Sequence, residues 1–373
     1  MSMTTYGARL DSVRLLTTLE HLFETNLRRQ EQGHMASPLC IWGTHGLGKT
    51  TCVKDFARKR GWKLAYCAPA QFEEMGDLHG LPTRTAPDPG AVGEERTVFL
   101  PPDWVPTEEG PGILLLDDLN RADDRILRGL MQLIQEFEMF SWSLPPKWQI
   151  VCTANPEGGD YSVTPMDDAM ITRMLHLTMV FDVKAWAGWA EEAGVDPRGI
   201  AFVLAYPELV NEKRTTPRSL TQFFEQIKDI PDLTARLDLV QILAMSALDE
   251  VTVGSFLAFV QQDLQNLITP EEVLDAADFD VTAARIQAAV KGKGTGRRMD
   301  VLSILCTRIH LWLARKGYTP APNHGRNLVA FLLLPELPND LRFALHRDLV
   351  TCGPKVTDLL RDKRLAELVL KGM

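Results

Sequence analysis

Several features that mark whole classes of protein are missing from this chain. The longest apolar run, at residues 328–334, stops at Pro335 and is far shorter than the ~20 residues that span a bilayer. The six widely spaced cysteines include no Cys-x-x-Cys pair, which argues against a zinc ribbon or a thioredoxin motif and favours reduced thiols. The first residues have no basic-then-apolar signal pattern. Together these absences predict a cytoplasmic protein with no membrane segment.

Positive charge is scarce too. Lys and Arg number 40 against 49 Asp and Glu, so the formal net charge is −9. This balance argues against a protein that coats nucleic acid by bulk charge and leaves only a local basic patch for such a role. With 24% charged and 45% apolar residues over 373 positions, we expect a globular chain with enough core for two or three domains.

What is present is an alternation of short apolar runs with helical patterns. Over residues 38–180 this order predicts a three-layer α/β domain built on a mostly parallel sheet. The expected helices are 8–30, 49–60 and 125–137, and the expected strands are 39–42, 63–67, 97–100, 113–117, 149–153 and 175–180.

The pattern predicts four consecutive parts. The α/β domain contains a Pro- and Gly-rich insert at about residues 76–110, and an irregular segment this long is usually functional. The chain then reads as helical, with Asp196 and Thr216 each placed as an N-cap before a proline. The stretch KGKGTGRR at 291–298 is expected to be a solvated loop rather than a phosphate or nucleic-acid contact. The expected parts are a helical segment (1–37), the α/β domain (38–181), a helical domain (182–265) and a further helical region (266–373).

The strongest chemical signal is the stretch GTHGLGKT at residues 43–50, which matches G-x-x-x-x-G-K-[ST] between a predicted strand and a predicted helix. Glycines let backbone N–H groups converge on phosphate oxygens, and the helix that starts there directs the positive end of its dipole at the same anion. Lys49 is placed to reach the β- and γ-phosphates, and the Thr50 hydroxyl to bind Mg²⁺. The predicted nucleotide-binding residues are Gly43, Thr44, His45, Gly46, Leu47, Gly48, Lys49, Thr50 and Thr51.

A second signal is the stretch ILLLDDLNR at 113–121, in which an apolar strand runs into two carboxylates. Ligands of open α/β sheets bind at the carboxyl ends of the strands. Asp117 is therefore predicted as the carboxylate on the Mg²⁺ side and Asp118 as the group that polarises an attacking water. The alternative is an Asp pair that caps the next helix, a role that Asp123 or Asp124 can fill instead.

Three polar residues further along are additional candidates. Asn155 ends the next predicted strand and is placed to hydrogen-bond the γ-phosphate or its water, unless it is an ordinary turn residue before Pro156. Arg173 follows a short predicted helix and is either a surface ion-pair partner or a finger that reaches a neighbour's nucleotide. Arg218 lies in the first turn of a capped helix, where it opposes the dipole, so we expect a nearby anion or, alternatively, a solvated arginine.

Taken in order over about residues 15–260, these motifs resemble those of AAA+ ATPases, and specifically of the MoxR-like branch. The resemblance rests on GTHGLGKT, GILLLDDLNRA, VCTANPEGGDY, DDAMITRM and TPRSL. Two stretches that flank the insert, GDLHGLP and FLPPDWVP, are similar to the branch that carries an insert in its second helix. The resemblance implies a P-loop NTPase core followed by an all-helical lid and further C-terminal helices.

The resemblance also implies residue roles. Asp117 and Asp118 resemble Walker B, Asn155 sensor 1, Arg173 the arginine finger and Arg218 sensor 2, so the implied catalytic residues are Lys49, Asp118, Asn155 and Arg173. The family usually has Glu where this chain has Asp118, whose side chain is one methylene shorter. The water must then sit closer, or hydrolysis is slower. Arg121 either acts between subunits or pairs with Asp123 or Asp124.

Assembly and partners follow from the same resemblance. An arginine finger completes a neighbour's site, which implies a homo-oligomeric ring, specifically a hexamer, that uses ATP and Mg²⁺. Such proteins remodel a client or a partner with a von Willebrand factor A domain, and Trp104, Phe140 and Trp142 are either client contacts or core residues. The competing functions are a nucleic-acid-associated motor and a nucleotide-gated scaffold with slow hydrolysis.

Overall fold

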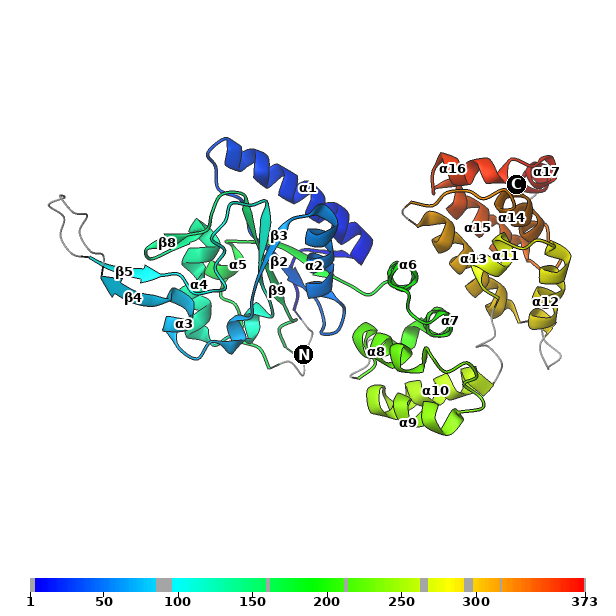
Figure 1. Ribbon diagram of the computed structural model, residues 1–373, viewed down its shortest axis with the longest axis horizontal. Helices are drawn as coiled ribbons and strands as arrows, with labels where there is room; N and C mark the ends of the chain where they lie inside the picture. The colour runs from blue at the N-terminus through cyan, green and yellow to red at the C-terminus, as the bar shows by residue number, and fades with distance from the viewer. Residues whose placement is uncertain are drawn as a thin grey trace. The chain divides into compact units, whose positions relative to one another are not determined.

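The computed structural model describes residues 4–84, 96–158, 162–210, 214–261, 268–291, 298–315 and 317–371. The chain divides into two compact units, Met1–Phe181 and Asp182–Met373 (Figure 1). All six cysteines are free thiols, and five of them are buried. Within the described ranges, no helix has both the length and the apolar character needed to cross a membrane.

The first unit is built on a six-stranded sheet whose neighbouring strands are all parallel, in the order β1-β10-β2-β9-β6-β3. Helices connect the strands, so the predicted α/β domain with a parallel sheet is confirmed. The strands are β1 (Ala8–Leu10), β2 (Leu39–Trp42), β3 (Lys63–Cys67), β6 (Gly112–Leu116), β9 (Trp148–Ala154) and β10 (Leu175–Met179). The helices of this unit are α1 (Ser12–Glu31), α2 (Lys49–Arg60), α3 (Met75–His79), α4 (Asp124–Glu136) and α5 (Asp168–Ile171).

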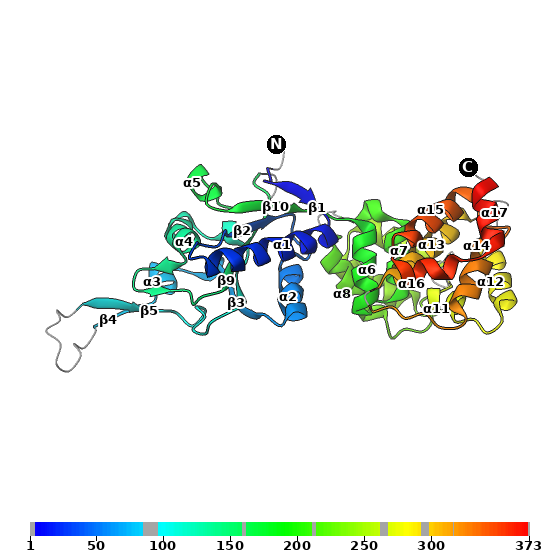
Figure 2. The ribbon, with the colours of Figure 1, turned by 90° about the horizontal axis from the view of Figure 1, so that it is seen from above.

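Helices cover both faces of the sheet because its central strands are apolar on both sides. All four residues of β2 are buried. Leu39 and Ile41 belong to the core shared with α1 and α2, whereas Cys40 and Trp42 belong to the core shared with α4. In both views α1 and α2 lie side by side (Figures 1 and 2). These two cores, one on each side of the sheet, give the three layers that the sequence predicts.

The sequence interpretation of residues 8–30 as a single helix is wrong at its start. Residues 8–10 form β1, which pairs with β10, and α1 begins only at Ser12. The side chain of Asp11 caps this helix by accepting a hydrogen bond from the Arg14 N–H at 2.9 Å. Val13, in the first turn of this helix, is 59% exposed. The strand was missed because three residues with a long-range partner carry little local periodicity.

Gly7 shows why the chain can enter β1 at this place. Its φ is +79°, and a Cβ there would lie 1.9 Å from the carbonyl oxygen of His176 in β10. Only glycine fits so close to a neighbouring backbone in this conformation.

The insert carries an antiparallel ribbon of β4 (Leu81–Arg84) and β5 (Thr97–Leu100), so the predicted strand at 97–100 is confirmed. The ribbon projects from the body of the unit in both views (Figures 1 and 2). Residues 85–95 lie outside the described ranges. A second small hairpin pairs β7 (Glu138–Met139) with β8 (Trp142–Ser143). Trp142 is only 8% exposed and packs in the core, whereas Phe140 is 59% exposed.

The second unit is helical. Asp196 and Thr216 cap their helices as predicted: Asp196 accepts from the Arg198 N–H at 2.8 Å, and Thr216 from the Ser219 N–H at 3.2 Å. The predicted loop at 291–298 falls mostly on residues 292–297, which lie outside the described ranges. The helices are α6 (Val183–Ala193), α7 (Pro197–Ala205), α8 (Pro217–Ile227), α9 (Leu237–Ala247), α10 (Glu250–Gln261), α11 (Pro270–Leu274), α12 (Phe279–Lys291), α13 (Met299–Ala314), α14 (His324–Leu332), α15 (Asn339–Val350), α16 (Pro354–Thr357) and α17 (Lys363–Lys371).

Buried ion pairs accompany the apolar core of this unit. Arg308 of α13 is 2% exposed and its Nε contacts the carboxylate of Glu191 in α6 at 3.0 Å. Arg198 pairs with Asp196 at 2.6 Å and also donates to the Ile230 carbonyl. These charges are satisfied within the unit, which is what burial requires of them.

Candidate functional site

The site is assembled where three neighbouring parallel strands end. Gly43 follows β2, Asp117 follows β6 and Asn155 follows β9, and β9 lies between the other two strands. The register places Trp42 opposite Ala154 and Leu116 opposite Cys152. The phosphate-loop motif and both polar strand ends therefore meet at one edge of the sheet, where ligands of such sheets bind.

The loop at residues 43–50 has the backbone form that an anion cradle needs. Gly43, Gly46 and Gly48 all have positive φ. A Cβ on Gly43 would lie 2.8 Å from the Met179 carbonyl oxygen, so no larger residue fits at the end of β2. At Gly48, with φ +92°, a Cβ would meet no described atom within 4 Å, so space is open where α2 begins. His45 and Thr51 are exposed, and Thr44 and Leu47 are half-buried.

Lys49 reaches back over this loop. Its Nζ donates to the carbonyl oxygens of Gly43 at 2.8 Å and Thr44 at 3.2 Å, and to Oδ1 of Asn155 at 3.2 Å. The residue is only 6% exposed. The ammonium group is thus held between the loop and the end of β9, at the N-terminus of a 12-residue helix whose dipole also favours an anion.

Asp117 accepts three hydroxyl hydrogen bonds. Its Oδ1 accepts from Thr50 at 2.6 Å and from Thr153 at 2.7 Å, and its Oδ2 accepts from Tyr66 at 3.1 Å. Burial, and after it the carboxylate of Asp117, raise the pKa of the Tyr66 phenol to about 12. Tyr66 therefore remains a donor to Asp117 at neutral pH.

Asp118 lies in a left-handed backbone conformation, with φ 52° and ψ 44°. Its N–H donates to the Thr153 hydroxyl at 2.8 Å, its Oδ1 accepts from Nδ2 of Asn155 at 3.0 Å, and its Oδ2 lies 3.3 Å from Nε of Arg121. Arg121 is thus paired with Asp118, and the sequence alternative of a partner at Asp123 or Asp124 is wrong.

The two acidic residues that follow have other roles. Asp123 caps α4 by accepting from the Ile126 N–H at 3.1 Å, and Asp124 pairs with Arg128 at 2.7 Å. Asp117 and Asp118 are therefore not needed as caps of α4, and their carboxylates remain at the sheet edge.

Asn155 joins the two halves of the site. It is fully buried, and its side chain spans Lys49 and Asp118. Its backbone is clamped by Asn120, whose Oδ1 accepts from the Asn155 N–H at 3.0 Å and whose Nδ2 donates to the Asn155 carbonyl at 2.7 Å. Such reciprocal bonds hold Asn155 far more firmly than an ordinary turn would.

Sequence reasoning missed Thr153, Asn120 and Tyr66. Thr153 is level with Asp117 only because of the register between β6 and β9, and Tyr66 reaches Asp117 only because β3 pairs with β6. Thr153, like Gln149, is a polar residue in the otherwise apolar run of β9, and a polar residue in a buried strand is a signal that a partner is needed there. For Tyr66 the local sequence carries no such signal.

The two predicted arginines lie outside this cluster. Arg173 is half-buried just after α5, where its Nε donates to Oε1 of Gln135 at 2.7 Å and its guanidinium also contacts the Ala169 carbonyl. Arg218 belongs to the second unit, is exposed, and makes no hydrogen bond or ion pair with any residue in the described ranges. The roles predicted for both stay predictions.

The donors at Thr50 and Asp117 suit Mg²⁺. No group of three or more His, Cys, Asp or Glu side chains in the described part of the chain can hold a metal ion by itself. Mg²⁺ in nucleotide sites keeps several waters and takes its remaining ligands from one or two protein oxygens and the phosphates. A hydroxyl and a carboxylate oxygen 2.6 Å apart fit that donor set.

Comparison with known proteins adds little to these residues. No family model and no curated protein matches the chain. Solved structures of RuvB from Thermotoga maritima align with it: a mutant at 14% identity and TM-score 0.40, over 82% of this chain and 89% of that chain, and the structure described as a Holliday junction branch migration motor at 15% identity and TM-score 0.37, over the same shares. A likeness this distant carries no argument about activity.

Proposed function

We propose that this chain is an AAA+ ATPase of the MoxR-like type that binds ATP with Mg²⁺ and hydrolyses it. The observation that carries the proposal is the hydrogen-bonded network at the sheet edge. It runs from Lys49 through Asn155 to Asp118, and from Thr50 to Asp117, and Thr153 joins the two aspartates. Phosphoryl transfer depends mainly on such positioning.

Each of these groups has a distinct task in the proposal. The backbone N–H groups of residues 43–51 bind phosphate oxygens, and Lys49 turns its ammonium to the β- and γ-phosphates. Thr50 and Asp117 hold Mg²⁺, which supplies neutralisation of phosphate charge when bound. Asp118 accepts a hydrogen bond from the attacking water, and Asn155 holds both the water and the Asp118 carboxylate in place.

The assembly part of the proposal concerns Arg173 and Arg218. Arg173, at the surface of the α/β domain (38–181), acts in the nucleotide site of the next subunit in a hexameric ring, where it stabilises charge on the transferred phosphoryl group. Arg218, in the helical lid (182–265), contacts the nucleotide of its own subunit. Its exposure and its position in the first turn of α8 support a role with an anion, because there the dipole alone disfavours a cation.

The proposed work of the ring is to remodel a client or a partner protein with a von Willebrand factor A domain. The insert at about 76–110 supports this because its β4–β5 ribbon projects from the unit and exposes Leu81 and Leu100, at 73% and 55%. Apolar side chains presented on a projecting ribbon favour contact with another protein. The region 266–373 has its own apolar core and is proposed as a partner-holding or ring-closing element.

A second candidate is a nucleotide-gated scaffold that hydrolyses ATP slowly. One observation favours it: both carboxylate oxygens of Asp118 are engaged, by Asn155 and by Arg121. A shorter carboxylate held on both sides has less freedom to follow the attacking water.

The first test is phosphate release from ATP with Mg²⁺. We expect wild-type protein to release phosphate, Lys49→Ala to release none, and the matched variant Lys59→Ala, exposed on the same helix, to behave as wild type. Equal rates for wild type and Lys49→Ala remove the ATPase proposal. Tight ATP binding without release in the wild type supports the scaffold.

The second test separates a finger in trans from one in cis. Arg173→Ala and Lys49→Ala are each expected to be inactive alone. In rings assembled at random from equal amounts of the two variants, about a quarter of the subunit interfaces pair an intact phosphate loop on one subunit with an intact Arg173 on the next. Recovered activity in the mixture supports the ring, and none contradicts it. Strong, salt-sensitive stimulation by DNA would instead favour the nucleic-acid motor.

A further inference from the structure

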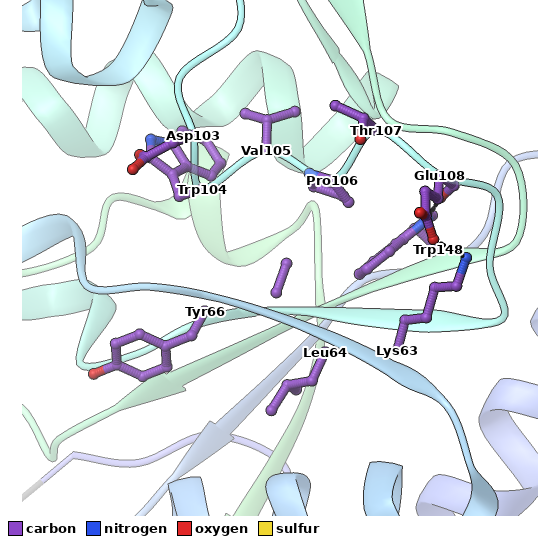
Figure 3. A pocket seen from close by; sticks show the side chains of 11 residues that line it. Lys63, Leu64, Tyr66, Asp103, Trp104, Val105, Pro106, Thr107, Glu108 and Trp148 are labelled. Atoms are coloured by element: carbon purple, nitrogen blue, oxygen red, sulfur yellow. Dashed lines mark hydrogen bonds and ion pairs between the residues drawn. The ribbon is translucent and has the colours of Figure 1, made fainter.

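A cavity of about 360 Å³ lies beside β3, at the opposite end of the sheet from β1. Its floor is the strand itself, and its other wall is the segment 103–108 together with Trp148 (Figure 3). The volume is within the range of pockets that bind small groups or side chains. None of the residues proposed above to bind nucleotide lines it.

The strand that forms the floor has backbone groups without partners. The Lys63 N–H donates to the Pro111 carbonyl at 3.0 Å, and the Cys67 carbonyl accepts from the Asp117 N–H at 2.8 Å, so these residues face β6. Because neighbouring residues of a parallel strand bond to opposite sides, the N–H and C=O of Leu64 and Tyr66 face away from β6. Within the described ranges, no strand or loop hydrogen-bonds to that side of β3.

The opposite wall carries polar side chains at Asp103, Thr107 and Glu108, and its apolar part around the two tryptophans is held in place. The indole N–H of Trp148 donates to the Glu108 carbonyl at 2.8 Å, and that of Trp104 donates to the Asp77 carbonyl at 3.2 Å. Both indoles therefore have their polar atoms satisfied and line the cavity, Trp104 as a half-buried ring and Trp148 as a ring that is only 3% exposed. Val105, 5% exposed, and Pro106 complete this wall.

The charges around the cavity are unequal at its two ends. At one end the Nζ of Lys63 pairs with Glu108 at 2.6 Å. At the other end, in the wall across the cavity from the strand that carries Tyr66, Asp103 is exposed and pairs with no cation in the described part of the chain (Figure 3). One carboxylate of the lining thus remains uncompensated.

We propose that this cavity is a docking site for an extended segment of a partner protein, which adds to the free edge of β3, inserts an apolar side chain against the two tryptophans and carries a basic residue that pairs with Asp103. Unpaired backbone donors and acceptors at strand spacing select an extended backbone over other ligands. The wall selects an apolar side chain, and the uncompensated carboxylate selects a cation.

The docked segment would also be linked to the candidate nucleotide site through one residue, Tyr66. Tyr66 belongs to the free edge, and its hydroxyl donates to Asp117. A segment bonded to the Tyr66 backbone would restrain that side chain, so peptide occupancy and Mg²⁺ occupancy are expected to influence each other.

The experiment uses amide hydrogen exchange on the full chain without nucleotide, so that its outcome does not depend on the proposed ATPase activity. The probe is the peptide acetyl-Lys-Val-Thr-Val-Lys-amide, whose order of side chains is the same whether it pairs parallel or antiparallel to β3. At saturation we expect exchange of the Leu64 and Tyr66 amides to slow by about tenfold or more, because bound molecules are closed to solvent. The Ala65 and Cys67 amides, already bonded to β6, should not change.

Two matched peptides test the chemistry. The same peptide with its three central amides N-methylated keeps the side chains but loses the donors, and it should give no protection. The peptide with Glu in place of both Lys should bind at least several-fold more weakly because of Asp103. Equal protection by the N-methylated peptide, or tighter binding of the Glu peptide, overturns the proposal.

Two variants test the place. Leu64→Pro removes the outward N–H at a position where an edge strand tolerates proline, and it should abolish protection of Tyr66 by the probe. Leu64→Ala keeps the N–H, so the probe should still protect the Tyr66 amide in this variant. Unchanged Ala65 and Cys67 exchange checks that β3 is intact in both. If Leu64→Pro disturbs β3, the comparison of the unmodified and N-methylated peptides on wild-type protein still tests the proposal. If β3 is intact in Leu64→Pro and the probe binds this variant as tightly as wild type, the proposal is overturned.

Discussion

The two units of this chain differ in how accessible their hydrogen-bonded polar groups are to solvent. In the helical unit, Arg308 is 2% exposed and forms an ion pair with Glu191, so its guanidinium is not accessible to a ligand. In the α/β unit, the polar groups at the sheet edge also bond to each other, but Thr50 and Asp118 keep part of their surface accessible.

This difference separates a structural network from a binding site. Both networks satisfy groups that would otherwise be costly to bury. Only the sheet-edge network lies beside open space at Gly48 and a helix N-terminus, where an anion is stabilised. Accessible oxygen atoms next to a positive helix end, rather than the number of hydrogen bonds, distinguish the candidate site from the buried pairs.

The largest expected effect breaks the structural network. Glu191→Ala leaves the Arg308 guanidinium buried without its hydrogen-bonded carboxylate, which costs about 3 kcal/mol of unfolding free energy. Arg285→Ala, which removes the exposed pair with Glu272 in the same unit, should cost less than about 1 kcal/mol. Denaturant unfolding followed by circular dichroism measures both. Equal costs would mean that burial does not determine how much each of these ion pairs stabilises the unit.

The next effect breaks the sheet-edge network. Thr153→Val keeps the shape of the side chain but removes the hydroxyl that joins Asp117 to the Asp118 N–H. We expect phosphate release to fall by roughly a hundredfold, because both carboxylates lose their positioning.

The control for this change is Thr178→Val, in β10 of the same sheet, whose hydroxyl donates to the Tyr6 carbonyl. It loses a buried hydrogen bond of the same kind away from the site. A similar fall in rate for both variants would mean that stability, and not positioning, sets the rate.

A smaller effect concerns Arg121. Its contact with Asp118 is 44% exposed on the arginine side and therefore weak. If the contact only restrains Asp118, Arg121→Ala should raise phosphate release by about two- to fivefold, equivalent to less than about 1 kcal/mol. A loss of activity as deep as that of Arg173→Ala would instead support a role between subunits. Initial rates at saturating ATP distinguish the two.

The smallest effect is the titration of Tyr66. Because its folded pKa is raised to about 12 from an unfolded value of 10.0, the protonated form is favoured by folding. The associated stability is present below pH 10 and is lost as pH rises toward 12. The difference between ultraviolet titrations of wild type and Tyr66→Phe isolates this group. A midpoint at 10 would show that the Tyr66 phenol is neither buried nor in contact with Asp117 in solution.

Much of the α/β unit can be predicted from the sequence because its signals are local. The bounds of β2, α2 and β3 agree with the predicted 39–42, 49–60 and 63–67, since apolar runs and flanking glycines define them. The sequence also predicts a single site for Lys49, Thr50, Asp117, Asp118 and Asn155, because each lies just beyond the carboxyl end of a strand, or after the loop that follows one, in one parallel sheet.

What the sequence could not supply depends on register and on long-range pairing. Thr153 acts only because it lies level with Asp117, and β1 exists only because residues some 170 positions later provide its neighbour. The buried pair of Arg308 and Glu191 joins two helices without any motif. Such partners follow from packing of the whole unit, and no local pattern encodes them.

The positive φ of Asp118 gives a reason for the residue found there. Left-handed backbone costs an ordinary residue roughly 1–2 kcal/mol, whereas short polar side chains such as Asp and Asn adopt it readily. The longer acid in Asp118→Glu would therefore extend further toward the attacking water, but it would also add strain to the turn that carries Asn120. The cleaner way to trap a nucleotide-loaded state is Asp118→Asn, which keeps the turn and the oxygen that accepts from Asn155 but removes the charge and the ion pair with Arg121.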